Sequence, residues 1–268
     1  MENYFTIPQS ALLKETVCSF WQVHRLNNLA VNETIIPKGI IEIIFSFETP
    51  KIYAQINNQA ITVPRCFVQG FHSCPVYLHL SDRQTFFGVV LHPSSAKYFF
   101  KIPPFEFINC AIDLTLIDDS FYNLWHYLGE QKNFNDRVSA FTNWLIKRLP
   151  VLTDREQAFN NFLNKHSNTS LTVSDLAVKF CYSSKQLSRK LYELTGMNTE
   201  QILLYKKYLQ SIHLMHNSEL SLTEIAYNCQ FFDQSHFIKT FKSLTLLTPK
   251  EYRQRKSYIV GHILENVS

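Results

Sequence analysis

Two short stretches in the carboxy-terminal half combine Lys, Arg, Gln, Ser and His at a spacing that places them on one face of a helix. Such side chains can hydrogen-bond base edges in the major groove of duplex DNA. Arg189 can donate two hydrogen bonds to guanine, and Gln234 can pair with adenine through two more. The candidate base-contacting residues are Lys185, Gln186, Ser188 and Arg189 in the first stretch and Gln234, Ser235, His236 and Lys239 in the second. The pattern predicts two helices that read DNA.

Further cationic and helix-capping residues around these stretches are suited to the DNA backbone. Lysine and arginine side chains and the free amides of helix starts are the groups that bind phosphate. The candidate phosphate-contacting residues are Lys190, Lys242, Lys250 and Arg253, together with the helix starts at Thr172 and Ser221. The opposite stripe of each helix is apolar and is expected in the core; it holds Leu187, Leu191, Phe237 and Phe241.

Other residues suggest a metal site or an enzyme, but their spacing argues against both. The histidines that a cupin-like metal site would use are His24, His72, His79 and His92, and the cysteines that could hold zinc are Cys18, Cys66, Cys74 and Cys110. Neither set has the close ligand pairs of a metal site, and no G-x-S-x-G nucleophile motif occurs. We expect no metal, no cofactor and no enzymatic activity. The alternative hypothesis is a small-molecule or metal-dependent β-barrel enzyme fused to a DNA-binding module.

The elements that would position the DNA-reading residues form a weak internal repeat. Residues 171–177 and 220–226 share a hydroxyl residue at a helix cap, an acidic residue soon after it and an aliphatic-Ala pair. Second helices are expected over 184–194 and 233–243, which gives the helix-turn-helix plan twice. A joining helix over 199–215 would span about 26 Å, so the two reading helices could lie roughly one DNA turn apart.

The amino-terminal half has a different pattern. Short runs of Val, Ile, Phe and Tyr separated by turns predict strands over 17–25, 40–47, 52–56, 66–69, 76–80 and 85–92, and helices follow over 94–101, 118–128 and 135–149. The first of these helices would be capped by Ser94 or Ser95. The fold class is therefore α+β, with a cupin-like antiparallel barrel or sandwich over 1–150, a linker over 150–154 and an all-α module over 154–256.

The helix expected over 135–149 carries more apolar surface than a short peripheral helix needs. Its large side chains are Phe141, Trp144, Leu145 and Leu149. Such a helix can pack on its own barrel or pair with its copy in a second chain. Because two-fold homodimers are the commonest oligomers, we expect a dimer through this helix.

Length, composition and charge fit this organisation. The 268 residues are 46% hydrophobic and 14% aromatic, enough for two packed domains. Residues 1–153 carry 12 Lys/Arg and 12 Asp/Glu, whereas residues 154–268 carry 14 and 10, so the net charge of +4 belongs to the carboxy-terminal part. With neither a membrane-length apolar run nor a signal peptide in the sequence, we expect a cytoplasmic protein.

The stretch LSLTEIAYNCQFFDQSHFIKTFKSLTLLTPKEYR, which ends at Arg253, resembles the second helix-turn-helix of the AraC/XylS family of bacterial transcription regulators. The first copy fits the same family, and the resemblance covers residues 154–255. It implies a cytoplasmic double helix-turn-helix regulator of the activator type, with duplex DNA as its partner. RNA polymerase, a small-molecule effector and a second copy of the chain are its further candidate partners, and no membrane is involved. Cys181, Gln230 and Leu246 stand where the family usually has Gly, which implies strained turns.

The amino-terminal half is similar to an uncharacterised β-rich domain that precedes AraC-type modules. The resemblance lies in Trp21, in Pro37-Lys38-Gly39 followed by Glu42, in Gly70 and in the run from Gly88 to Pro93. Lys38 replaces the usual Asp. The resemblance implies a role in sensing or dimerisation.

Overall fold

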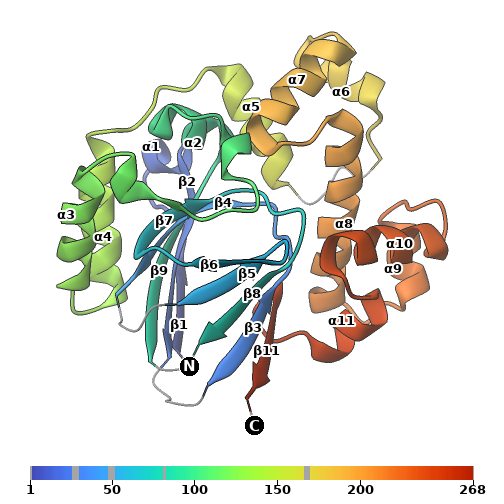
Figure 1. Cartoon of the computed structure of the whole chain (residues 1–268). Coiled ribbons are helices and arrows are strands. Elements are labelled where there is room, and N and C mark those ends of the chain that lie inside the picture. The colour runs from blue at the N-terminus through green and yellow to red at the C-terminus, as the bar shows by residue number, and fades with distance from the viewer. Residues whose placement is uncertain (1, 26–29, 48–51, 81–82, 166–169, 268) are drawn as a thin grey trace.

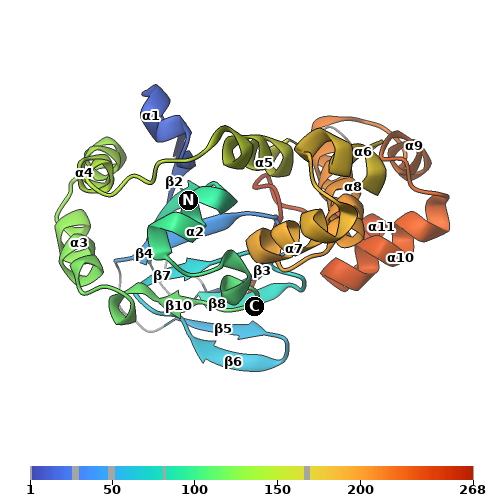
Figure 2. The same ribbon diagram turned by 90° about the horizontal axis from the view of Figure 1, so that it is seen from above.

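The computed structural model describes residues 2–25, 30–47, 52–80, 83–165 and 170–267. A two-sheet sandwich occupies the amino-terminal half, and helices make up most of the rest (Figure 1). Seen from above, α3 and α4 lie on one side of the sandwich and the helices from α5 onward lie on the other (Figure 2). None of the helices in these ranges has the length and apolar character of a membrane span.

One sheet is six-stranded and antiparallel, in the order β1-β2-β9-β4-β7-β10. Its strands are β1 (Glu2–Thr6), β2 (Val17–Arg25), β4 (Ile41–Ser46), β7 (Cys66–Gln69), β9 (Gln84–Leu91) and β10 (Ile112–Asp113). Residues alternate between its two faces, as the two-residue period of a strand requires. Phe20, Phe45 and Phe87 point to one face, and Trp21 and Glu42 border a cavity on the other.

The second sheet is five-stranded, in the order β11-β3-β8-β5-β6. It contains β3 (Val31–Ile35), β5 (Tyr53–Ile56), β6 (Gln59–Thr62), β8 (Val76–Leu80) and β11 (His262–Asn266). The last strand comes from beyond the helical module and pairs with β3 from His262↔Ile35 to Asn266↔Val31. The two sheets do not close into a barrel, so the expected barrel or sandwich is a sandwich.

Helices α3 (Ser120–Gly129) and α4 (Phe134–Ile146) cover the six-stranded sheet. Phe141 contacts the rings of Phe20, Phe45 and Phe87, and both Phe141 and Leu145 are fully buried. These two side chains are therefore packed within the chain, and the expected dimer through this helix stays a prediction. The helix also ends at Ile146, with Lys147 as its C-cap, before the expected end at Leu149.

Helix α2 (Pro93–Phe100) begins differently from the prediction. His92 is its N-cap, Pro93 occupies its first turn, and no side chain caps it. Proline suits this position because its fixed φ is helical and its missing N–H would be unpaired anyway. Ser94 and Ser95 are instead buried, and the Ser95 hydroxyl donates to the Glu15 carbonyl at 2.8 Å. The predicted serine cap is therefore wrong.

The remaining helices complete the carboxy-terminal half and the connections. They are α5 (Asp154–Asn164), α6 (Val173–Phe180), α7 (Ser184–Thr195), α8 (Thr199–Asn217), α9 (Leu222–Asn228), α10 (Gln234–Thr245) and α11 (Pro249–Arg255), with α1 (Ala11–Lys14), η1 (Pro104–Phe107) and η2 (Leu114–Leu116) in the connections. One continuous cluster of buried side chains joins both halves, extending from Leu13 to Ile263. The sandwich and the helices therefore share a core.

Candidate nucleic-acid interface

The first helix-turn-helix unit consists of α6 and α7. Thr172 and Ser183 cap the two helices, and each closes a capping box with the third residue of its helix. Reciprocal capping satisfies backbone amides that would otherwise be unpaired at the helix start. Leu176 and Leu187 are fully buried between the helices. The local sequence therefore fixes where both helices begin, and their buried residues fix the angle between them.

The second unit, α9 and α10, repeats the plan. Ser221 caps α9 with a capping box to Glu224, and Asp233 caps α10 by accepting from the His236 amide at 2.7 Å. Phe237 and Phe241 are fully buried, as predicted from the helical period. Helices α7 and α10 both pack against α8, so one 19-residue helix carries both units (Figure 1).

Most of the predicted base-contacting residues lie on the free surface of α7 and α10. Lys185, Gln186, Arg189, Gln234, Ser235 and Lys239 are exposed, whereas Ser188 and His236 are half-buried. Gln186 Oε1 accepts from the amide and the hydroxyl of Ser183, both at 3.0 Å. Its amide nitrogen is the part that can donate to a base. The His236 ring packs against Phe231, with 5.5 Å between ring centroids.

The predicted phosphate-contacting residues divide into two groups. Lys242 and Lys250 are exposed, and the Thr172 and Ser221 side chains stand at helix starts. Two others have partners within the protein: Lys190 forms an ion pair with Glu193 at 3.5 Å, and Arg253 donates from Nη2 to the Leu220 carbonyl at 2.9 Å. Arg253 therefore also holds α11 to the start of the second unit.

The carboxy-terminal end of α7 is docked on the amino-terminal half. Glu193 pairs with Lys97 of α2 at 2.7 Å, and the Tyr192 ring lies 5.5 Å from that of Phe105. Gly196, at φ +69°, leaves room for Ile108, whose Cδ1 would stand 1.8 Å from an added Cβ. The docked end anchors the first unit, while the end that carries Lys185 and Arg189 faces outward.

The three non-glycine turn residues adopt the strained backbone that their positions predict. Cys181, Gln230 and Leu246 have φ values of 53°, 57° and 60°. Side chains with a Cβ are disfavoured in this left-handed region. A contact that the sequence did not reveal supports the second turn, because Lys207 Nζ donates to the Gln230 carbonyl at 2.6 Å.

Glycine at these turns should stabilise the protein. We expect Cys181→Gly and Leu246→Gly each to raise the free energy of unfolding by about 0.5–1 kcal/mol, because relief of a left-handed Cβ outweighs the added freedom of the unfolded chain. Urea denaturation followed by circular dichroism measures the change. Val178→Gly, in the exposed interior of α6, is the control and should destabilise by about 0.4 kcal/mol. A loss of stability in all three variants would contradict the strain argument.

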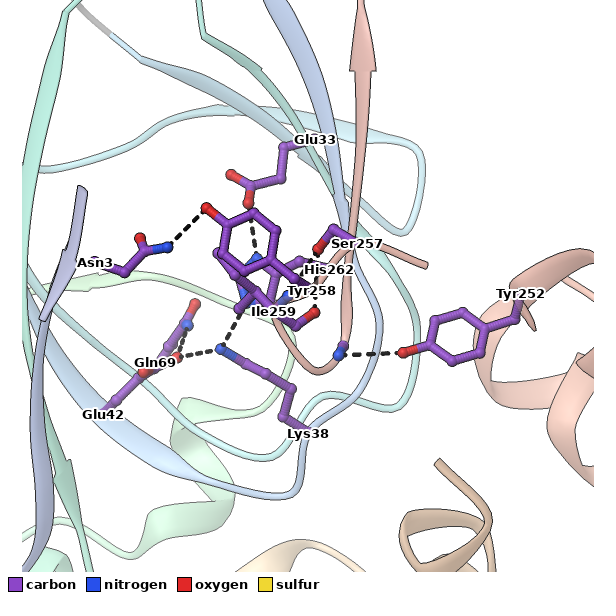
Figure 3. Close-up of polar contacts among 11 residues, drawn as sticks. Asn3, Glu33, Lys38, Glu42, Gln69, Tyr252, Ser257, Tyr258, Ile259 and His262 are labelled. Carbon is purple, nitrogen blue, oxygen red and sulfur yellow. Dashed lines mark hydrogen bonds and ion pairs between the residues drawn. The ribbon is translucent and has the colours of Figure 1, made fainter. Parts of the chain in front are cut away.

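A large cavity of about 830 Å³ lies between the two sheets. Aliphatic side chains of β5, β6 and β8 form much of its wall, and Leu209 and Ile212 of α8 also border it. At its polar end, Glu42 accepts from Gln69 Nε2 at 2.7 Å and Lys38 Nζ at 3.3 Å (Figure 3). It also accepts from Trp21 Nε1 at 3.0 Å. Lys38 and Glu42 belong to the pattern that resembles the β-rich domain, but no site was predicted there from the sequence.

The histidines and cysteines considered for metal binding do not gather. His92 contacts Cys18 and the Lys14 carbonyl, whereas His79 is exposed on β8 beside Asn32. Within the described ranges, no group of three or more His, Cys, Asp and Glu side chains is arranged to hold a metal ion. All six cysteines are free thiols, with Cys66 and Cys229 buried and Cys181 exposed.

Comparisons with known proteins agree with this arrangement. Residues 176–255 match the family described as helix-turn-helix domain, and residues 6–113 match a domain of unknown function, DUF6597. The HTH-type transcriptional activator RhaS of Escherichia coli is 31% identical over 141 residues, which are 47% of this chain and 51% of the relative. RhaS of Salmonella schwarzengrund is 30% identical over 99 residues, 37% of this chain and 36% of the relative. The chain thus spans about half the length, or less, of these curated relatives.

A solved structure supports the fold of the whole chain. The crystal structure of unsaturated fatty acid bound ToxT from Vibrio cholerae has a TM-score of 0.50 and 15% identity, and the match covers 94% of this chain and 96% of ToxT. At this identity the likeness concerns the fold. The two family matches show a helix-turn-helix domain over residues 176–255 that follows a domain of unknown function over residues 6–113, and the carboxy-terminal half of the chain is similar to the HTH-type transcriptional activator RhaS.

Proposed function

We propose that this protein is a sequence-specific DNA-binding transcription regulator that reads two adjacent major-groove segments with α7 and α10. The observation that carries the proposal is the repeated geometry of the two units. Each unit has capped helices, a buried apolar stripe and an exposed start of the second helix, and both are mounted on α8. At 1.5 Å per residue, the 19 residues of α8 span about 28 Å, comparable with one turn of DNA at about 34 Å.

Charge supports the same function. The net excess of four positive charges belongs to residues 154–268, where it can attract the phosphate backbone. Lys185, Lys239 and Lys242 are exposed in the two units, and Lys250 is exposed in α11. Because released counterions contribute to such binding, the affinity for duplex DNA should fall steeply with salt.

The amino-terminal sandwich is proposed as the effector domain. Its cavity is apolar along most of its wall and has one polar end, which is the usual construction of a small-molecule site. The ToxT structure of similar fold holds an unsaturated fatty acid, which supports a ligand with a large apolar part for this chain. Contact with RNA polymerase, pairing of two chains on one DNA site and action as an activator in the bacterial cytoplasm are further parts of this proposal.

The enzymatic alternative has less support. A hydrolase or a metal enzyme needs a nucleophile or ligands brought together in a site. In the described ranges the candidate ligands of the sandwich are dispersed, as His79 and His92 illustrate. The regulator therefore remains our proposal, and stoichiometric metal in the purified full chain would favour the alternative.

Selection from a random duplex library tests the proposal. The purified full chain should enrich an asymmetric site in which two short motifs lie about ten base pairs apart, because two non-identical helices read it from one chain. Binding of the enriched site is then measured across a range of salt concentrations. A folded chain that enriches no sequence, or that ignores duplex DNA at low salt, would overturn the proposed function.

Substitutions at the reading helices should separate base contacts from phosphate contacts. We expect Arg189→Ala and Gln234→Ala each to weaken binding to the selected site by about 1–3 kcal/mol and to leave binding to unrelated duplex nearly unchanged. Lys242→Ala should weaken both and reduce the salt dependence by about one phosphate contact. Lys132→Ala removes the same charge from an exposed site outside the module and should change neither. Equal losses of specific and non-specific binding in all three module variants would contradict the assignment.

A further inference from the structure

The chain does not end with the DNA-binding module but returns to the sandwich. After α11, residues 257–266, here called the tail segment, turn back and add β11 to the edge of the five-stranded sheet (Figure 1). The Ile36 amide donates to the Gly261 carbonyl at 2.9 Å, which continues the pairing with β3 into the turn. Ile263 is buried in the shared core. The tail segment is therefore a structural part of the amino-terminal domain.

The same segment is tied to the DNA-binding module. The Gly261 amide donates to the Tyr252 hydroxyl at 3.2 Å, and Tyr252 is fully buried against Phe241 of α10 (Figure 3). Arg255 at the end of α11 pairs with Glu265 of β11 at 2.7 Å. Movement of the tail segment would therefore disturb the position of α11 and the core behind α10.

The tail segment also forms one wall of the cavity. Its cavity-lining residues are Tyr258, Ile259, Val260, Gly261, His262 and Leu264. The Tyr258 hydroxyl accepts from Asn3 Nδ2 at 2.7 Å, so the segment bridges β1 and β11, the edge strands of the two sheets. Gly261 has φ +80°, and an added Cβ would lie 3.0 Å from Cγ of Lys38. The turn thus packs closely on the polar end of the cavity.

His262 places a side chain of the tail segment among the charged groups of the cavity. Its Nδ1 lies 2.7 Å from Glu33 Oε1, and its Nε2 lies 3.5 Å from Nζ of Lys38, which pairs with Glu42 (Figure 3). Two carboxylates here face one ammonium and one imidazole, so this end carries no excess of positive charge for an anionic head group. Arg25 also borders the cavity, and it donates to the Leu80 carbonyl. The chemistry matches a largely apolar molecule with an uncharged, hydrogen-bonding end.

We propose that the tail segment completes the ligand site and links its occupancy to the DNA-binding module. A ligand of this class contacts the tail segment and holds β11 and α11 in place, and loss of the ligand loosens both. This inference rests on the effector role in the proposed function. The DNA-binding module can be held with the tail segment docked or released from it. A ligand that binds the docked tail segment more tightly favours the docked position of the module, and the docked position in turn favours the ligand.

The test uses the uncharged fluorescent probe N-phenyl-1-naphthylamine and the full chain. We expect saturable binding, competition by 1-decanol more effectively than by decanoate, and at least a fivefold slowing of amide exchange in residues 249–266 when the probe is bound. A chain ending at Lys256 should bind the probe at least tenfold more weakly, and His262→Ala severalfold more weakly. Asn266→Ala, in the same strand but exposed and outside the cavity wall, is the matched control and should bind normally.

Each outcome decides the proposal. If the full chain does not bind the probe, if decanoate competes better than decanol, or if bound probe leaves exchange in residues 249–266 unchanged, the inference is wrong. Unaltered binding by a folded, shortened chain would also overturn it. If the shortened chain does not fold, His262→Ala and the exchange data decide alone. Selection on duplex DNA is scored separately, so a chain that binds DNA but shows no linkage loses only this inference.

Discussion

Replacing Lys38 by methionine should lower the free energy of unfolding by about 3 kcal/mol, because it leaves the Glu42 carboxylate buried without its cationic partner. Glu42 is 1% exposed. Burial by itself would raise the pKa of Glu42, but Lys38 and the hydrogen bonds from Gln69, Lys38 and Trp21 outweigh burial and hold this pKa below its ordinary value. Glu42 is therefore ionised at neutral pH, and its charge needs compensation.

A double substitution distinguishes loss of the charge partner from loss of packing. Lys38→Met together with Glu42→Leu removes both charges, and such replacements of a whole buried pair are often close to neutral. We expect the double variant to recover most of the stability lost by Lys38→Met in urea denaturation. Glu265→Gln breaks an ion pair that is exposed on both sides and should cost well under 1 kcal/mol. A double variant as unstable as Lys38→Met would show that the ion pair is not the cause.

The helical half could be predicted closely because its signals are local. The caps Thr172, Ser183 and Ser221 lie within three residues of the backbone amides that they satisfy. The helical period alone separated the buried stripe of each second helix from the exposed one, as Leu187 and Arg189 show. Helices α7 and α10 accordingly lie within two residues of the expected ranges. Whether their exposed residues contact DNA stays a prediction.

Strands were predicted only where the apolar pattern is dense. The bounds of β2, β7 and β8 match the expected ranges, whereas β1, β3, β6, β10 and β11 were missed. The missed strands are short or lie at sheet edges, and polar residues such as Glu265 and Asn266 weaken their pattern. Their strand conformation depends on a partner strand, and for β11 that partner is more than 220 residues away along the chain. No local signal could reveal such a pairing.

The same limit explains why the packing of α4 and the cavity were not foreseen. The apolar stripe of α4 has a composition that suits a domain core as well as a dimer, and only the position of the six-stranded sheet shows that Phe141 and Leu145 belong to the core. The polar end of the cavity joins Glu33, Lys38, Glu42 and His262, which the sheets bring together from both ends of the sequence. Sequence patterns describe faces of elements, and contacts between elements come from the fold.

Acidification from pH 7 to pH 5 should destabilise the protein, with His72 alone contributing about 2 kcal/mol. His72 is 7% exposed, its Nε2 contacts Gln69 at 3.2 Å, and its backbone carbonyl accepts from the Tyr205 hydroxyl of α8 at 3.2 Å. Burial lowers the pKa of His72 from 6.5 to about 4. Between these values the unfolded chain binds a proton that the folded chain does not, so the free energy of unfolding falls as the pH falls below 6.5 and levels off below about 4.

Urea denaturation at pH 7 and pH 5 measures this effect. The free energy of unfolding at pH 7 minus that at pH 5 should be smaller by about 2 kcal/mol in His72→Asn than in the wild type. This expectation holds whatever the variant does to stability at pH 7. His216, whose pKa burial also lowers to about 4, contributes in the same direction and retains its share in this variant. Glu42 does not titrate in this window, because its pKa lies below 4.5. His79→Asn, at an exposed position on β8, is the control and should leave the pH difference unchanged. If the free energy of unfolding of His72→Asn falls between pH 7 and pH 5 by as much as that of the wild type, the acid sensitivity has another source. Our expectation that the buried His72 takes up a proton on unfolding would then be wrong.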